Sequence, residues 1–576
     1  MTFEATRKQP TQEHFYLVEV DLPIITGTCE ITEGVEGYGT PLSCPIQDGT
    51  SATVIKTYTF ATDNAPLMNK SPVYRCLSGV NEQATELQNG KGLAIRGRAT
   101  LTFQDFIGDP NIERASGEAA KDNGTFFGKL SSRNIFENRG VRVKTNGKGA
   151  WALSCADELS KVEYDQAQVP REQSSLLRQS INSTVKDIPV DAVTDWNQLS
   201  TPYIIRIGEE FMTVTAVNNN QTLTATLRVE NRGLPIGSPD WSQTITQTIN
   251  AEHDGGDDIF ICLAYDNANI ADVISAILQS AGIDPLYIPI ADWYDEIEQW
   301  HPNNKITSIF YEPEEADTVV SKVLEAYLLN LWFDPIAREL KLKAISSWVE
   351  SSSTLTEGKE IDYESLSLTA DESIRYSRAF IKYNKPFLAN PDEDVQFKKA
   401  SLAVRPELET VAYYGTRPKT KRFNNSILLD KDGADLLVSR YVQRFGITPI
   451  KYSWTTQERN LNFSVGDVVN INALDVQGFD GLPSSNRRAQ IIKVQPINAR
   501  FGREYKVNAL TYQPASGDNA IFTINSATEL NLYVLAGAPP TAVTLTFIFD
   551  GGAFSSSASN RPSVKAGGFS TGSKIT

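Results

Sequence analysis

Five cysteines and three histidines are the side chains best able to bind a metal or act as nucleophiles in this chain of 576 residues. Cys29 and Cys44 have fourteen residues between them, and those residues form a glycine-rich loop. Such a pair can form a disulfide, supply half of a metal site, or consist of two unrelated buried thiols. The pair taken alone leaves these three alternatives open.

The compartment in which the chain folds bears on the disulfide alternative. The N-terminal sequence MTFEATRKQPTQEHF lacks the apolar stretch of a secretory signal. No continuous apolar run reaches the roughly eighteen residues of a membrane-spanning helix, so we expect no membrane span. We therefore expect folding in a reducing cytoplasm, where structural disulfides are disfavoured.

The histidines give little support for catalysis. His14, His253 and His301 have no motif partner, and the sequence contains no H-E-x-x-H, Walker loop or C-x-x-C. His253 beside Asp254 could act as a general base, but no nucleophile is specified nearby, which favours a histidine that caps a turn. The glycine-rich residues 90–97 precede a strand pattern rather than a helix, which is a poor phosphate cradle. We predict that the protein is not an enzyme.

The charge balance limits the partners. The net charge is −16 and the isoelectric point is near 4.9. No stripe of Lys and Arg alternates with aromatic residues, which argues against sequence-specific nucleic-acid binding. Because an acidic surface repels phosphates, such a protein could let DNA pass without binding it.

Alternating apolar and polar residues predict strands over most of the first 180 residues. Residues 99–103 and 141–149 alternate in this way. Cys155 falls on the same face as Trp151 and Leu153, and it is most simply a small buried hydrophobic residue. The pattern is typical of a half-buried β-barrel or sandwich.

Further along, the period of the pattern changes from two to that of a helix. A helix is predicted over 267–282, with Asn267 or Asn269 as its cap and Gly282 as its end. A second helix leads into two strands joined at Asp334-Pro335, and a third is predicted over 433–445. We expect one shared core, formed by Ile274, Ile277, Val323, Leu324, Trp332 and Leu342.

These patterns predict a multidomain, mainly β protein with an inserted α/β domain. The chain is divided into a first β domain with the cysteine loop at 1–180, a small all-β module at 181–258, an α/β domain of helices and a hairpin at 259–350, a second β-rich domain at 351–515, and a Gly/Ser/Ala-rich segment at 516–576.

Several stretches occur in a distinctive order. They are CLSGVNEQATELQNGKGLAIRGRATLTFQDF (76–106), GTFFGKLSSRNIFENRGVRVKTNG (124–147), YIIRIGEEFMTV with ENRGLPIG, AGIDPLYIPIADW (281–293) and LNFSVGDVVNI (461–471). The ordered set, covering roughly residues 14–576, resembles the tail hub (tail tip) proteins of long-tailed bacteriophages with flexible tails.

The resemblance implies both an architecture and a function. Residues 1–180 and 351–515 would form two β-barrels akin to the tail-tube fold, and three copies would give a pseudo-six-fold ring on the tail axis. Such a homotrimeric baseplate hub closes the tube, joins it to tip or fibre proteins, and opens for DNA ejection. The implied partners are the distal tail protein ring and the tape measure protein, with DNA crossing the lumen without specific binding. The expected location is the virion tail tip, after assembly in the host bacterial cytoplasm.

The resemblance also bears on the cysteines. Tail tips of this class can hold a 4Fe-4S iron–sulfur cluster, which usually needs four thiolates. With Cys155 assigned to a strand core, Cys29, Cys44, Cys76 and Cys262 remain as candidate metal ligands. Zinc would use the same thiolates in tetrahedral geometry. The alternatives without a metal are unrelated buried thiols, or a Cys29–Cys44 disulfide.

Two other functions stay open at this point. One is a cell-wall-degrading enzyme carried at the tip, and the other is a receptor-binding adhesin in the last sixty residues. The segment from 516 resembles the start of the Gly-rich tip region of relatives, which usually continues further. We therefore expect either a shortened tip or more chain beyond Thr576.

Overall fold

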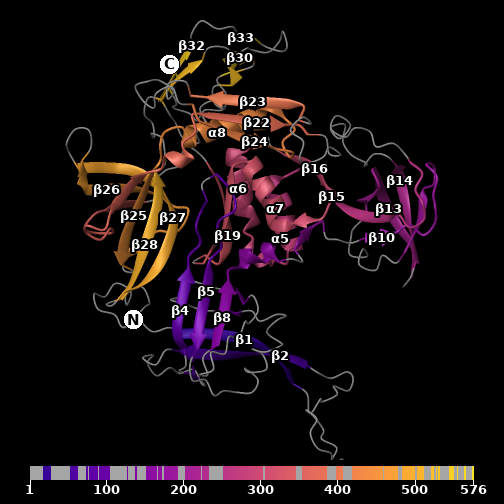
Figure 1. Cartoon of the computed structure of the whole chain (residues 1–576), viewed down its shortest axis with the longest axis horizontal. Coiled ribbons are helices and arrows are strands. Elements are labelled where there is room, and N and C mark those ends of the chain that lie inside the picture. Colours follow the sequence, from indigo (N-terminus) through magenta and orange to yellow (C-terminus); the bar gives the residue numbers. More distant parts are fainter. Residues whose placement is uncertain are drawn as a thin grey trace, which may run out of the picture.

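The computed structural model of the chain describes its central part most fully (Figure 1). The described residues are 77–103 without 89, 151–191 without 165–166 and 171–173, 201–232 without 222–223, 251–345 without 302–304 and 336, 353–385, 397–405, and 418–511 without 458–459, 478–482 and 500–501, together with isolated strands in 17–74, 126–138 and 520–575. The fold is mainly β with several helices near its centre, which confirms the predicted fold class. In the part of the chain that the structure describes, no helix is long and apolar enough to cross a membrane.

The N-terminal strands form two four-stranded sheets. The first, in the order β3-β2-β1-β6, contains β1 (Leu17–Thr26), β2 (Ala52–Ala61), β3 (Val73–Tyr74) and β6 (Phe126–Phe127). The second, in the order β4-β5-β8-β7, contains β4 (Leu77–Gln83), β5 (Arg98–Phe103), β7 (Glu137–Asn138) and β8 (Trp151–Ala156). Ala99 and Leu101 of β5 are buried, which confirms the predicted alternation there. The predicted strand at 141–149 lies outside the described residues.

A seven-stranded sheet follows, in the order β10-β15-β12-β13-β14-β11 with β16 paired to β15. Its strands are β10 (Ser174–Leu176), β11 (Asp187–Val190), β12 (Tyr203–Ile207), β13 (Glu210–Gln221), β14 (Thr224–Arg232), β15 (Asp258–Ala268) and β16 (Ile306–Phe310). The sheet has an aliphatic core that includes Ile205, Leu227 and Ile259. Figure 1 shows β15 running from this sheet to the central helices, so one strand ties the module to the rest.

Three helices and a hairpin form the centre of the molecule. They are α5 (Ile270–Ser280), α6 (Ile290–Trp300), α7 (Ala316–Ala326), β18 (Leu329–Asp334) and β19 (Glu339–Ala344). Asn269 caps α5 by accepting a hydrogen bond from the Ala271 N–H, and Gly282 follows with φ 89°, as predicted. The six residues predicted to share a core are all buried in one cluster, which confirms that prediction.

Helix α6 has no counterpart among the predicted helices. It begins just after Pro289, and the short 3-10 helix η4 (Pro285–Tyr287) precedes it. Its sequence IADWYDEIEQW carries four acidic residues, and its buried apolar face consists of Trp293, Ile297 and Trp300. Large aromatic residues at helical spacing therefore hold α6 in the core, whereas the predicted helices rest mainly on aliphatic residues.

The second β-rich part contains a six-stranded sheet in the order β20-β26-β27-β28-β25-β21. Its strands are β20 (Ser353–Thr356), β21 (Ser367–Ala370), β25 (Ile450–Gln457), β26 (Val468–Gln477), β27 (Pro483–Ala499) and β28 (Gly502–Thr511). Trp454, Phe463 and Ile491 lie in its core. In the turn before β26, Gly466 has φ 93° and the Asp467 carboxylate accepts a hydrogen bond from the Ser464 N–H at 2.7 Å.

A separate three-stranded sheet covers the helix α8 (Lys431–Phe445). The sheet has the order β23-β22-β24 and consists of β22 (Arg378–Tyr383), β23 (Lys399–Val404) and β24 (Thr420–Asn424). Ala379 and Ile381 of β22 join Val438 and Tyr441 of α8 in the central core. The predicted helix at 433–445 is thus confirmed, and it begins two residues earlier, where Asp430 accepts from the Gly433 N–H at 2.8 Å.

The C-terminal segment contains short strands in parallel pairs. They are β29 (Ala520–Ile524), β30 (Ala527–Thr528), β31 (Leu530–Asn531), β32 (Thr544–Phe549), β33 (Phe554–Ser555), β34 (Val564–Lys565) and β35 (Lys574–Ile575). The pairing joins β29 to β32 to β35, β30 to β33, and β31 to β34.

Candidate functional site

Of the four candidate metal ligands, the structure describes only Cys262; Cys29, Cys44 and Cys76 lie outside the described residues. Cys262 lies in β15 opposite Ile204, and it is 4% exposed within a cluster that also contains Phe211 and Ile309. Burial raises the pKa of its thiol to about 12, against a smaller opposing effect of the Arg206 charge. In these surroundings the sulfur is a neutral thiol, whereas a metal ligand is a thiolate.

The described residues contain no group of three or more His, Cys, Asp or Glu side chains that could hold a metal ion. Three of the four cysteines are not among those residues, so the iron–sulfur or zinc site stays a prediction. An iron–sulfur cluster or zinc ion bound at Cys262 would require the thiolate form of a thiol that has apolar neighbours.

His253 belongs to a buried network in the β module. Its Nε2 lies 2.8 Å from Oε2 of Glu210, and the same carboxylate pairs with Arg232 at 2.8 Å. The Ala251 N–H also donates to Glu210, at 3.1 Å. Burial alone would raise the pKa of Glu210, but these hydrogen bonds and the Arg232 charge lower it below its ordinary value.

This buried network has a structural role. Glu210 begins β13 and Arg232 ends β14, so the ion pair closes the base of the hairpin, and His253 joins it from the start of the next segment. The second ring nitrogen of His253 is 3.8 Å from the Asp257 carboxylate. The two carboxylates hold the ring of His253 in place.

The predicted turn-capping role of His253 differs from what is observed. The turn at 254–257 is closed by the Asp257 carboxylate, which accepts from the Asp254 N–H at 3.0 Å. Ser180 also contributes, because its hydroxyl accepts from the Gly255 N–H at 3.1 Å. Short polar side chains suffice for such a turn, so the imidazole is left to pair with Glu210.

Residues 84–95 connect the first β part to the second β-rich part. The Ala84 N–H donates to Oε1 of Gln495 at 2.9 Å, and the Leu87 N–H donates to the Ile492 carbonyl at 2.9 Å. Lys493 forms an ion pair with Glu86 at 2.8 Å. These contacts all reach β27, about four hundred residues later in the chain.

The other edge of the same segment joins the central hairpin. The Ala94 N–H donates to the Leu331 carbonyl at 3.1 Å, and the Leu331 N–H donates to Gly92 at 2.9 Å. Gly92 has φ 76°, and a Cβ there would lie 2.6 Å from the Leu324 Cβ. The glycine-rich run at 90–97 therefore allows close packing of backbone against α7, in line with its poor match to a phosphate cradle.

A second junction joins α6 to α8 through buried polar groups. Arg440 is 1% exposed; its guanidinium donates to the Trp300 carbonyl and lies 5.1 Å from the centroid of that indole ring. Its Nη1 is 3.3 Å from Nε2 of His301. Burial, and then the Arg440 charge, lower the pKa of His301 well below its ordinary value, against a backbone hydrogen bond with Tyr327. The histidine is therefore neutral and accepts from the arginine.

One feature of the sequence indicates this junction. Arg440 and Arg444 both occur within the apolar face of the helix at 431–445, in the run SRYVQRF. Charged residues at core positions are rarely buried unless they are paired, so their presence marks a polar contact across the core.

A cavity of about 250 Å³ lies between the 84–95 segment and α7. Its lining mixes both signs of charge, and Arg96 crosses it to pair with Glu163 at 2.9 Å. Asp317 lies 3.9 Å from the same guanidinium. Because the cations and carboxylates of the lining neutralise one another, the cavity does not indicate a class of ligand.

Comparison with known proteins adds only a distant structural likeness. No family model and no curated protein matches the chain. Among solved structures, it is similar to a 43 kDa tail protein of prophage MuSo2 from Shewanella oneidensis, with 11% identity and a TM-score of 0.27 over 58% of this chain and 92% of that chain. It is also similar to a chain of the virion of a native gene transfer agent, with 12% identity and a TM-score of 0.32 over 57% of this chain and 78% of that one.

A third similar structure is a type VI secretion component of E. coli, described as structurally similar to the bacteriophage T4 tail proteins gp27 and gp5. The match has 10% identity and a TM-score of 0.31 over 79% of each chain. These neighbours are tail, virion and secretion-system proteins. Every TM-score is below 0.5, so the likenesses carry no conclusion about the site.

Proposed function

We propose that the protein is a structural baseplate hub at the distal end of a phage tail. As a homotrimer it closes the tube, contacts the distal tail protein ring and the tape measure protein, and joins the tube to tip or fibre proteins. It opens for DNA ejection. The proposal assigns no catalytic role to the chain.

The connection between the two β-rich parts is the observation that carries this proposal. Residues 84–95 hydrogen-bond to β27 on one edge and to β18 on the other. One hydrophobic core extends from Leu87 through the central helices to Leu510. Interdigitated core packing resists compression, so parts that share a core move together. A plug at the end of a tube needs this property, because it must hold against the packaged DNA.

The ordered sequence stretches support the same function. The stretch at 281–293 contains η4 and the start of α6, and the stretch at 461–471 contains the turn at Gly466 and the start of β26. Both stretches therefore occupy defined places in the fold. Two β-rich parts in each of three copies would give the pseudo-six-fold symmetry that seats on a six-fold tube.

The location is testable on virions. Antibodies raised against this chain and imaged by electron microscopy should label the tail end distal to the capsid, and nothing else. Labelling of the head, or along the whole tube, would refute the proposed location. A native mass near three times 63.6 kDa is expected for the assembled hub.

The DNA path gives a second test of the proposal. With a net charge of −16, the soluble protein should bind duplex DNA weakly at physiological salt. Tight binding that weakens steeply with salt would argue against a lumen through which DNA slides. A filter-binding titration at several salt concentrations distinguishes the two outcomes.

A further inference from the structure

Most of the net charge of the chain is concentrated in one segment. Residues 233–304 contain twelve Asp or Glu and no Lys or Arg, which is a formal charge of −12 out of −16. The described part of this segment includes the whole of β15, α5, η4 and α6. Its exposed carboxylates on and around the two helices are Asp272, Asp284, Asp292, Asp295 and Glu298.

An apolar side chain protrudes from this acidic surface. Leu286 is 81% exposed, more than any other large hydrophobic residue among those described. It lies in η4, where the Asp284 carboxylate accepts from its N–H at 2.9 Å, and Ile283 and Ile288 on either side are buried. The backbone around Leu286 is thus anchored, and the side chain is presented to solvent by a fixed turn. A fixed, exposed apolar side chain is typical of an interface anchor.

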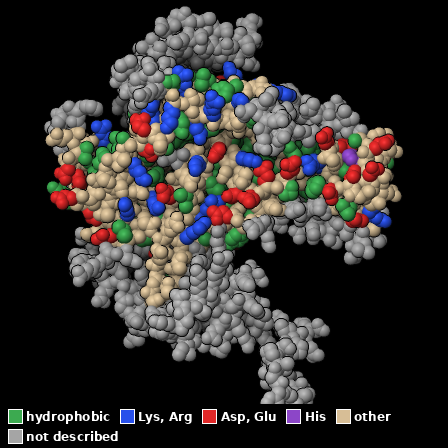
Figure 2. Space-filling model, in the orientation of Figure 1, with side chains coloured by type: hydrophobic (Ala, Val, Ile, Leu, Met, Phe, Trp, Pro, Cys, Tyr) green, Lys and Arg blue, Asp and Glu red, His purple; other side chains and the backbone are tan. Residues whose placement is uncertain are grey.

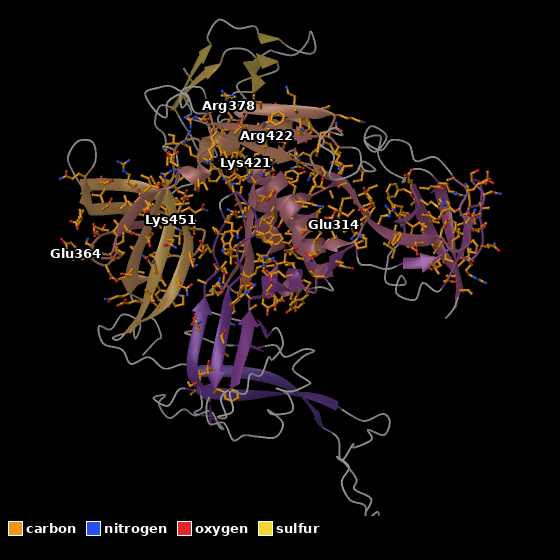
Figure 3. All side chains as sticks on the ribbon, in the orientation of Figure 1. Glu314, Glu364, Arg378, Lys421, Arg422 and Lys451 are labelled. Carbon is orange, nitrogen blue, oxygen red and sulfur yellow. The ribbon has the colours of Figure 1, made fainter. Side chains whose placement is uncertain are left out.

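The opposite charge gathers on the sheet that covers α8. Residues 373–429 contain eleven Lys or Arg and five Asp or Glu, a formal charge of +6. Figure 2 shows Lys and Arg side chains over this part of the molecule, and Figure 3 shows Arg378, Lys421 and Arg422 on the sheet. In a chain this acidic, a basic region of that size is unexpected from composition.

The outer face of this sheet is also partly apolar. Ala379 and Ile381 of β22 pack towards α8, so the alternate residues of the three strands face away from it. By strand register, the outward positions are Arg378, Phe380, Lys382, Leu402, Val404 and Arg422. Leu402 is 55% exposed, and Val404 beside Arg378 is also exposed.

We propose that the acidic surface around Leu286 of one copy docks on the outer face of the β22–β23–β24 sheet of a second copy. The two surfaces are complementary in two respects. Their charges are opposite, and each has an apolar centre. Within one copy they do not cover one another, because Leu286 and Leu402 are both exposed there. A contact between two different surfaces is head-to-tail, and it closes into a ring when the rotation allows.

This interface rests on the proposed function in one respect: a ring of three is the closure that a homotrimeric hub requires. The charges would accelerate encounter and set the orientation of the copies, and the apolar side chains would add the buried contact. A nucleic acid fits the basic face less well, because a phosphate backbone offers no apolar group for Leu402 and Val404.

Charge reversal tests the proposal directly on the full-length chain. We expect Arg422→Glu and Asp295→Lys each to weaken self-association at least about tenfold, the range of a disrupted interface charge. Mixing the two variants, or combining both substitutions, should restore part of the loss. Leu286→Ala should also weaken association, and it removes no buried contact within a copy. Sedimentation equilibrium at low and high salt measures the association constant of each variant.

Matched controls separate the proposed interface from net charge. Lys506→Glu and Glu209→Lys make the same charge changes at exposed positions on β28 and in the β12–β13 turn. They should associate as the wild type does. Thermal melting of every variant checks that the fold is retained, so that a loss of association reports the interface.

Three results would overturn the inference. One is a trimer whose stability is unchanged by Arg422→Glu, Asp295→Lys and Leu286→Ala. The second is a wild-type chain that stays monomeric at every concentration. The third is loss of duplex DNA binding in Arg422→Glu with association unchanged. Antibody labelling of virions tests the proposed function separately. Label found away from the tail tip would refute the hub function but would not contradict the interface.

Discussion

His301 should remain unprotonated in the folded protein to a pH well below that of an ordinary histidine. It lies where α6 meets α8, with Arg440 at 3.3 Å and with its pKa lowered first by burial and then by the arginine charge. The perturbation is a fall in pH, and the matched variant is His301→Gln. A glutamine can still accept from Arg440 and donate to a carbonyl, but it does not titrate.

The magnitude follows from linkage. In the unfolded chain His301 binds a proton near its ordinary pKa of 6.5, whereas the folded state does not. A folded pKa below the unfolded one means that stability from this group is complete above pH 6.5 and is lost as pH falls below it. Each pH unit below 6.5 therefore costs about 1 kcal/mol, and the fall from pH 7.5 to 5.5 costs between about 1 and 1.5 kcal/mol.

Two assays measure this effect. Urea unfolding of wild type and His301→Gln at pH 7.5, 6.5 and 5.5 should show a steeper loss of stability in the wild type, because other titrating groups are common to both. The chain has only three histidines, so NMR of histidine-labelled protein can follow each ring directly. Arg440→Met removes the nearby charge and should raise the pKa of His301 towards its ordinary value.

A His301 resonance that titrates near pH 6.5 in the folded wild type would refute this reasoning. Parallel stability curves for the wild type and His301→Gln would refute it as well. A junction that opens at mildly acidic pH would appear differently, as a loss of the Trp300 environment in fluorescence before global unfolding.

Three further predictions concern packing. Ile277→Ala should cost about 2–5 kcal/mol of unfolding free energy in urea titrations, since the side chain is fully buried, and a cost below about 0.5 kcal/mol would show an exposed face. Gly466→Ala should cost about 1–3 kcal/mol, because φ is 93° and a Cβ would overlap the Trp332 indole; unchanged melting would contradict this. Cys262 should react with iodoacetamide at pH 8 at least about a hundredfold more slowly in the folded than in the unfolded chain, as mapped by mass spectrometry. Equal rates would show an accessible thiolate.

Elements with a strong period could be predicted from the sequence. The helix with Ile274 and Ile277 and the one with Val438 and Tyr441 were predictable because aliphatic residues recur at helical spacing beside a clear stop. The strand at 99–103 followed from strict alternation. Helix α6 could not be predicted this way, because its core face consists of two tryptophans and one isoleucine in an acidic run.

The polar contacts of the candidate site could not be predicted from the sequence, for a different reason. Glu210, Arg232 and His253 are far apart in the chain, and strand pairing brings them together. Arg440 meets His301 across 139 residues. Local patterns report which residues are buried, but the partner of a buried charge is decided by tertiary packing. The four cysteines illustrate the same limit, since their spacing alone does not decide whether they meet.

The connection of residues 84–95 to β27 has a consequence for synthesis on the ribosome. The Ala84 N–H has its hydrogen-bond acceptor in the side chain of Gln495, which is synthesised 411 residues later. At about 5–20 residues per second, the first β part remains without this partner for roughly 20 to 80 s. Leu87, buried in the finished protein, lacks its hydrogen-bond partner Ile492 during the same interval. The nascent chain is therefore vulnerable to misassociation with neighbouring copies on the same message until its second β-rich part is complete.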